Sequence, residues 1–149
     1  DYYRNEFQNV KAACGYTEMA KKTVEKCRAL GLRVALATNP LFPAIATHSR
    51  IRWAGMAPEA FELVTTYENS SSCKPNLLYY KEVMGKLGVV PEECLMVGND
   101  VAEDMVARHL GLRVFLLTPC LLNKHNEDIE QFPHGDFPEL LTFLEQAAE

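Results

Sequence analysis

An amide and two carboxylates closely follow a short apolar run in this chain. Residues 94–97 are apolar, and Gly98-Asn99-Asp100 comes directly after them, with Asp104 four residues beyond Asp100. An unbroken apolar run before a glycine is typical of a buried strand, so Asp100 is expected at the carboxyl end of a strand, where open α/β sheets bind ligands. Oxygen ligands of this kind suit Mg²⁺. The competing interpretation is that these acids only cap the next helix.

Two other apolar runs or loops end in polar groups. Thr38-Asn39 follows the apolar run 34–37, and Lys74 precedes a segment with helical periodicity. Because strand ends in a parallel sheet meet at one edge, these groups are expected to converge with Asp100. A hydroxyl, an ammonium group and an acid pair on a cation together describe a site for phosphoryl chemistry. Helix capping by Thr38 and a surface position for Lys74 are the structural alternatives.

Alternating helices and apolar strands must position these residues. The periodicity predicts helices over 17–30, 40–55, 74–88, 101–110 and 138–147, strands over 32–38, 61–67, 94–97 and 113–118, and an irregular segment over 123–136. This alternation favours an α/β fold, a three-layer Rossmann-like parallel sheet with helices on both faces.

Composition excludes several classes of protein. The 149 residues carry a formal charge of −5 and are 48% hydrophobic, which argues against a nucleic-acid partner and indicates one folded domain. No apolar run approaches the roughly 20 residues of a membrane span. Five cysteines without a C-x-x-C pair are expected to be free, mostly buried thiols in a cytoplasmic protein.

Three segments resemble motifs of the haloacid dehalogenase-like hydrolases, a superfamily dominated by phosphatases. L-R-V-A-L-A-T-N-P, ending at Pro40, is similar to the second motif of the family, and Cys73-Lys74-Pro75 is similar to the third. V-G-N-D-V-A-E-D, residues 97–104, is similar to the fourth. The resemblance covers about residues 17–118 and depends on the order and spacing of all three motifs.

The resemblance implies a role for each matching residue. Thr38 would bind the transferring phosphoryl group with help from the Asn39 amide, and Lys74 would hold the nucleophile and the phosphate. Asp100 would bind Mg²⁺, with Asp104 assisting directly or through water. The family often has glycine followed by aspartate where this chain has Gly98-Asn99-Asp100, so Asn99 is an alternative ligand. A carboxylate binds Mg²⁺ better than an amide, which favours Asp100.

One family motif is absent. The nucleophile of the family is the first aspartate of a D-x-D motif after an apolar strand, and no such motif occurs in this sequence. We therefore expect residues 1–16 to be the return from a missing cap or N-terminal part, and 17–149 to be a partial core domain without its central first strand. A missing N-terminal segment or a partner chain would supply that strand, and this chain alone would be inactive.

The expected function is a Mg²⁺-dependent hydrolase that removes phosphate from a small phosphorylated substrate through an aspartyl-phosphate. A dehalogenase or phosphomutase of the same fold is one alternative, although dehalogenation needs no Mg²⁺. A non-catalytic binding or signalling domain that uses the same sheet edge is the other.

Overall fold

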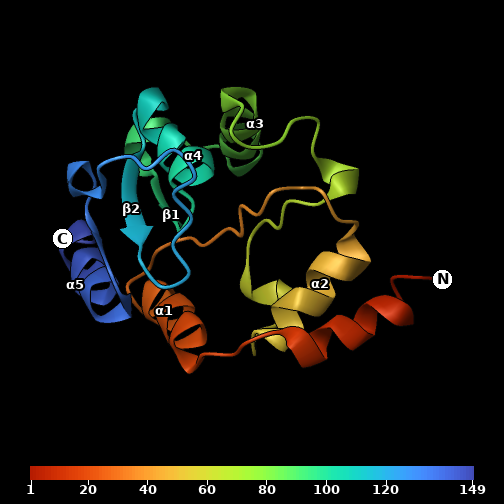
Figure 1. Cartoon of the computed structure of the whole chain (residues 1–149). Helices are drawn as coiled ribbons and strands as arrows, with labels where there is room; N and C mark the ends of the chain where they lie inside the picture. Colours follow the sequence, from red (N-terminus) through yellow and green to blue (C-terminus); the bar gives the residue numbers. More distant parts are fainter. The chain divides into compact units, whose positions relative to one another are not determined.

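A computed structural model describes residues 1–149 as two compact units, Asp1–Ser71 and Ser72–Glu149 (Figure 1). The first unit contains the 3₁₀ helices η1 (Glu6–Ala13), η2 (Pro58–Ala60) and η3 (Tyr67–Asn69) and the α-helices α1 (Glu18–Ala29) and α2 (Ala44–Trp53). The second contains α3 (Leu77–Leu87), η4 (Pro91–Glu93), β1 (Leu95–Gly98), α4 (Val101–Asp104), η5 (Met105–Leu110), β2 (Arg113–Leu117), η6 (Ile129–Gln131), β3 (His134–Gly135) and α5 (Phe137–Ala147).

The second unit is built on a three-stranded parallel sheet in the order β1-β2-β3. Leu95 pairs with Arg113 and Gly98 with Leu116, so the carboxyl end of β1 lies beside the end of β2. The strand predicted over 94–97 and the one predicted over 113–118 are confirmed. β1 is an edge strand of this sheet, with β2 as its one neighbour.

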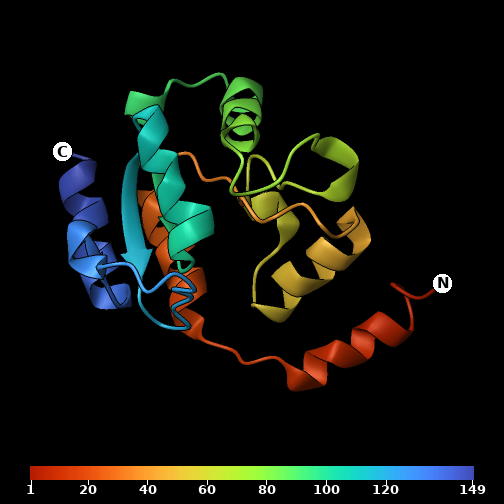
Figure 2. The ribbon, with the colours of Figure 1, turned by 45° about the horizontal axis from the view of Figure 1, so that its top comes forward.

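Helices cover both faces of this sheet. Phe115 of β2 contacts Phe143 of α5, with the ring centroids 5.2 Å apart. Val114 and Leu116 point to the opposite face, because side chains alternate along a strand, and both are buried. Figures 1 and 2 agree in placing α5 on one side of β2 and α4 with η5 on the other. The α/β fold with a parallel sheet between helices is therefore confirmed.

Local signals fix the ends of α3. The Asn76 side chain accepts a hydrogen bond from the Leu78 amide at the start of the helix, and Gly88 ends it with φ of 66°. Asn is a strong N-cap residue, and a glycine in the left-handed region is the usual helix stop. The helix predicted before Gly88 is confirmed.

The helix predicted over 101–110 is confirmed: it is α-helical over Val101–Asp104 and continues as the 3₁₀ helix η5 to Leu110. One prediction for the second unit is wrong. The segment 123–136, predicted to be irregular, contains η6 and the short strand β3. β3 forms because Leu116 and Leu117 of β2 offer it a parallel partner, which local sequence cannot reveal.

In the first unit, α1 has the predicted boundaries. The Thr17 hydroxyl accepts a hydrogen bond from the Met19 amide and caps the helix, and Gly31 follows its end with φ of 77°. No residue of α1 is buried, so its apolar face is only partly covered.

The strands predicted over 32–38 and 61–67 are wrong as regular strands. They meet in one isolated parallel bridge, Leu36 with Val64. Main-chain hydrogen bonds accompany it from Glu62 to Val34, from Leu36 to Leu63 and from Thr65 to Leu36, all between 2.8 and 3.1 Å. Both apolar runs pair as extended backbone. A regular strand needs hydrogen bonds to a partner along its whole length, and the pairing between these two runs is short.

An aromatic cluster holds η1 against α2. Phe7 is buried, and its ring centroid lies 5.5 Å from that of Trp53 and 5.8 Å from that of Phe42. The Gln8 side chain also donates to the Ser49 hydroxyl at 3.1 Å. The N-terminal segment is thus packed within the first unit. Its origin as the return from a cap domain stays a prediction.

None of the five cysteines forms a disulfide bond. Cys14, Cys73 and Cys120 are exposed, so the expectation of mostly buried thiols is wrong. As for the helices, none combines the length and the apolar character that crossing a bilayer requires.

Candidate active site

The second unit brings together four of the six predicted site residues near the carboxyl end of β1. Asn99 and Asp100 follow the strand directly, and the Asp100 side chain accepts a hydrogen bond from the Glu103 amide at 3.0 Å. Asp100 is therefore the N-cap of α4, the structural role that competes with metal binding. A carboxylate has further acceptor sites, so capping leaves Asp100 able to bind a cation.

Asp104 is buried and bound from two sides. One carboxylate oxygen accepts from the Lys74 Nζ at 2.7 Å, and the other accepts from the Asp100 amide at 3.0 Å. Both side chains of the ion pair are less than a tenth exposed. Burial removes solvent screening, so this pair interacts far more strongly than a surface salt bridge. The predicted convergence of Lys74 with the acids after β1 is present in the structure.

Gly98 leaves the space that the Asp104 carboxylate occupies. A Cβ atom built on Gly98 would lie 2.1 Å from Asp104 Oδ2 and 2.3 Å from its Cγ. Distances below about 3 Å are not seen between real Cβ atoms and their neighbours. The last residue of β1 must therefore be glycine for Asp104 to reach this position. From the sequence, Gly98 is expected only to end the strand.

A second loop supports Asn99. The side-chain amide of Asn99 donates to the Cys120 carbonyl at 2.7 Å. The main-chain carbonyl of Asn99 accepts from the Leu122 amide at 2.9 Å. The Val101 amide in turn donates to the Leu122 carbonyl at 2.9 Å. The loop after β2 thus fixes the backbone on which both candidate ligands lie. The sequence contains no signal that predicts this contact between the loop after β2 and Asn99.

These oxygen donors fit a hard cation. Asp100, Asp104 and Asn99 offer carboxylate and amide oxygens, the ligands that Mg²⁺ takes, and that ion usually keeps several waters. Residues 1–149 contain no group of three or more His, Cys, Asp or Glu side chains placed as a ready-made metal cage. A site with one or two protein carboxylates plus water and phosphate is the arrangement that such residues can form. Which of Asn99 and Asp100 is a direct ligand stays a prediction.

Thr38 and Asn39 belong to the first unit. They follow the extended run 34–37, and the buried Thr65 hydroxyl donates to the Thr38 carbonyl at 2.5 Å. The Leu41 amide donates to the Asn39 carbonyl at 2.8 Å, which turns the chain toward α2. The structure therefore fixes the backbone of this loop within its own unit. The meeting of Thr38 with Lys74 and the acids stays a prediction.

A carboxylate from η3 caps α2. Pro43, the residue before the helix, supplies no side-chain cap, and both oxygens of Glu68 accept from the Ala44 amide at 2.9 and 3.0 Å. Hydrogen bonds from its own main-chain amide and then from Ala44 and Thr66 hold the pKa of Glu68 below its usual range. Glu68 thus ties η3 to the start of α2 within the first unit.

Replacing Glu68 with Gln should destabilise the protein by about 0.5 to 1 kcal/mol at neutral pH, because the charge at the helix N-terminus is lost. A carboxyl whose folded pKa is depressed stabilises the fold above its unfolded pKa and loses that contribution as pH falls through the folded pKa. The difference between wild type and variant should therefore vanish in acid. Urea unfolding across pH measures it. Glu127→Gln, an exposed change of the same charge, is the control and should have little effect at any pH.

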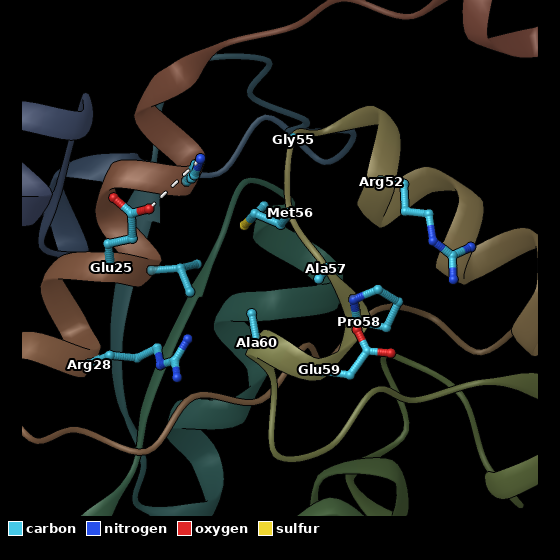
Figure 3. A pocket seen from close by; sticks show the side chains of 11 residues that line it. Glu25, Arg28, Arg52, Gly55, Met56, Ala57, Pro58, Glu59 and Ala60 are labelled. Atoms are coloured by element: carbon cyan, nitrogen blue, oxygen red, sulfur yellow. Dashed lines mark ion pairs between the residues drawn. The ribbon is translucent and has the colours of Figure 1, made fainter.

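A separate pocket of about 570 Å³ lies in the first unit (Figure 3). Figure 3 shows Glu25 and Arg28 on α1 facing Met56 and Ala60 of the segment that follows α2. None of the six predicted site residues lines it. The Lys21–Glu25 pair at its edge, 3.9 Å apart, is half-exposed and therefore weak.

Known proteins resemble this chain over most of its length. A glyceraldehyde 3-phosphate phosphatase from Methanocaldococcus jannaschii is 28% identical over 117 residues, which cover 78% of this chain and 48% of that protein. Haloacid dehalogenase-like hydrolase domain-containing protein 3 from Xenopus laevis is 28% identical over 134 residues, covering 86% of this chain and 53% of that protein. The chain thus spans about half the length of these curated relatives.

Solved structures give the same result for the fold. A predicted phosphoglycolate phosphatase from Haemophilus somnus superposes with a TM-score of 0.71 at 23% identity, covering 95% of this chain and 61% of that one. The family model described as haloacid dehalogenase-like hydrolase matches residues 4–111, well over half of the sequence. The match includes both residues of the buried Lys74–Asp104 pair. Because the match spans well over half of the sequence, this chain belongs to the haloacid dehalogenase-like hydrolases.

Proposed function

We propose that the protein is a Mg²⁺-dependent phosphatase that acts on a small phosphomonoester. The observation that carries the proposal is the buried contact of Lys74 with Asp104 at 2.7 Å, beside the Asp100 amide and at the carboxyl end of a parallel strand. A cation and an acid held together in a buried place can orient a phosphoryl group and its metal ion without reorganisation during the reaction. The phosphatase names of the curated relatives support the same reaction class.

In the proposed site, Asp100 and Asp104 hold Mg²⁺, with Asn99 as the alternative to Asp100. The ion would neutralise charge on the phosphoryl oxygens as a Lewis acid. Lys74 keeps Asp104 in place and adds positive charge. We propose that Thr38 and the Asn39 amide donate hydrogen bonds to phosphoryl oxygens.

The proposal assigns the attacking carboxylate to a strand outside these 149 residues, because no apolar run here is followed by D-x-D. The free edge of β1, whose residues are apolar, would accept that strand in parallel. The aspartate would attack the phosphorus and form an aspartyl-phosphate as the alcohol of the substrate leaves, and water would then hydrolyse the aspartyl-phosphate to inorganic phosphate and the free carboxylate. Residues 1–149 alone would not turn over substrate. We propose the cytoplasm as its location, since none of the five cysteines forms a disulfide bond.

Activity of the full-length protein on p-nitrophenyl phosphate and on glyceraldehyde 3-phosphate, with Mg²⁺ and after chelation, tests the function. We expect turnover with Mg²⁺ and a loss of at least about 100-fold without it, because the cation screens the transferring phosphate. Metal-independent release of halide from a 2-haloacid would instead identify a dehalogenase. Binding of phosphate without any turnover would identify a non-catalytic domain.

Thr38→Val in the same protein tests the predicted phosphate ligand. Val keeps the shape of Thr but loses the hydroxyl, so kcat/KM should fall by about 10- to 100-fold if the hydroxyl bonds the phosphoryl group in the transition state. Thr23→Val is the matched control, because the Thr23 hydroxyl donates to the Met19 carbonyl on α1. Equal activity of the Thr38 variant and wild type would remove Thr38 from the site.

A further inference from the structure

Two consecutive tyrosines of α3 lie close to the buried ion pair. Tyr79 and Tyr80 are both almost completely buried, and their rings meet edge to face with centroids 5.1 Å apart. The Lys74 Nζ lies 5.9 Å from the centroid of the Tyr79 ring. The Tyr80 hydroxyl donates to the carbonyl of Glu103, the residue before Asp104. One helix therefore contacts both partners of the pair or their immediate neighbours.

The hydrogen bond of Tyr80 reaches the backbone where α4 changes into η5. α4 is only four residues long and passes into the 3₁₀ helix η5 directly after Asp104. A short helix that changes geometry has few internal hydrogen bonds to fix its last turn, so tertiary contacts must do so. Tyr80 supplies such a contact one residue before the carboxylate that Lys74 and the Asp100 amide share.

The environment of Tyr80 favours the protonated hydroxyl, which can donate a hydrogen bond. Burial, together with the negative charges of Asp104, Glu103 and Asp100, raises the pKa of Tyr80 well above its usual range. This shift favours the neutral phenol, the form that can donate to the Glu103 carbonyl. A buried hydroxyl without an acceptor costs free energy, so the folded state favours the geometry in which Tyr80 contacts the Glu103 carbonyl.

We propose that Tyr80 is a positioning residue of the phosphatase site: its hydrogen bond to the Glu103 carbonyl holds the turn from Asp100 to Asp104 so that the Asp104 carboxylate stays between Lys74 and the Asp100 amide. This inference rests on the proposed function for its catalytic consequence. Its structural part concerns only residues of the second unit and can be tested without activity.

Tyr80→Phe in the full-length protein tests the proposal, because it removes the hydroxyl and keeps the ring. The first measurement is amide hydrogen exchange resolved by NMR. The Asp100 amide, which donates to Asp104, should exchange about five- to tenfold faster in the variant, as expected for loss of one buried hydrogen bond. The Leu116 amide, bonded to the Pro133 carbonyl in the sheet, should exchange at the wild-type rate.

Equal acceleration at Asp100 and Leu116 would mean that Tyr80 only stabilises the whole fold, and no acceleration at Asp100 would mean that it positions nothing. Either result overturns the proposal. Tyr2→Phe is the matched control, since Tyr2 is 58% exposed and lies in the other unit. It should change neither amide.

The second measurement is steady-state kinetics of the same variant. We expect kcat to fall about tenfold with KM within about twofold of wild type, because a misplaced metal ligand affects the transition state more than substrate binding. An unchanged kcat beside faster exchange at Asp100 would overturn the catalytic consequence. If wild type has no phosphatase activity, the proposed function fails, and the exchange result still decides whether Tyr80 positions the turn.

Discussion

Lys74→Met should destabilise the protein by about 3 to 5 kcal/mol, the usual cost of leaving one member of a buried ion pair without its partner. Lys74 and Asp104 lie 2.7 Å apart and are both nearly inaccessible to water. After the substitution, the Asp104 carboxylate keeps one charge and retains a single donor, the Asp100 amide. Chemical unfolding of the full-length protein, followed by fluorescence of Trp53 and by circular dichroism, measures the loss.

A double variant separates charge from packing. Lys74→Met combined with Asp104→Asn leaves no buried charge, and Asn can still accept from the Asp100 amide, so at least half of the lost stability should return. Activity should stay at least about 100-fold below wild type in both variants, because the cation and the acid are both needed at the phosphoryl group. A double variant as unstable as the sum of its single changes would show that the pair is not coupled.

Gly98→Ala should lower activity by about 100-fold, because displacing a catalytic group by about 1 Å has an effect of that size. The added Cβ would lie 2.1 Å from Asp104 Oδ2, so the carboxylate must leave its contacts with Lys74 and the Asp100 amide. We expect a loss of stability of about 1 to 3 kcal/mol from the same overlap. The variant should also need a higher Mg²⁺ concentration for half-maximal activity.

Gly85→Ala is the matched control for this substitution. Gly85 lies within α3, and an added Cβ would meet no heavy atom within 4 Å. Alanine is the better helix former, so this variant should be unchanged or more stable by up to about 1 kcal/mol. If both glycine variants behave alike in unfolding and activity assays, the contact between Gly98 and Asp104 has no functional weight.

The local elements of the fold were predictable because their signals are local. Thr17 and Asn76 cap α1 and α3, and Gly31 and Gly88 end them with positive φ, so the helices predicted over 17–30 and 74–88 begin and end close to these residues. The apolar run before Gly98 was also recognisable, and it became β1 because β2 pairs with it along its whole length. A capping side chain or a left-handed glycine acts within a few residues, so it has the same meaning in any tertiary context.

Pairing between strands was less predictable. The runs around Leu36 and Val64 were expected to be strands and share only one bridge, whereas β3 was expected to be irregular. A strand is defined by its partner, and a partner lies far away in the chain. The length of a ladder therefore depends on tertiary packing that no window of sequence contains.

The sequence by itself determined the residue types of the candidate site, the strand and helix that carry Asp100 and Asp104, and the family to which the motifs belong. Only the tertiary structure decided that Lys74 and Asp104, which are 30 residues apart, form a buried pair, that Gly98 must lack a side chain beside them, and that Tyr80 supports the turn. The physical reason is range: propensities and caps act between neighbours in the chain, whereas burial, ion pairing and steric exclusion depend on which distant residues are packed together.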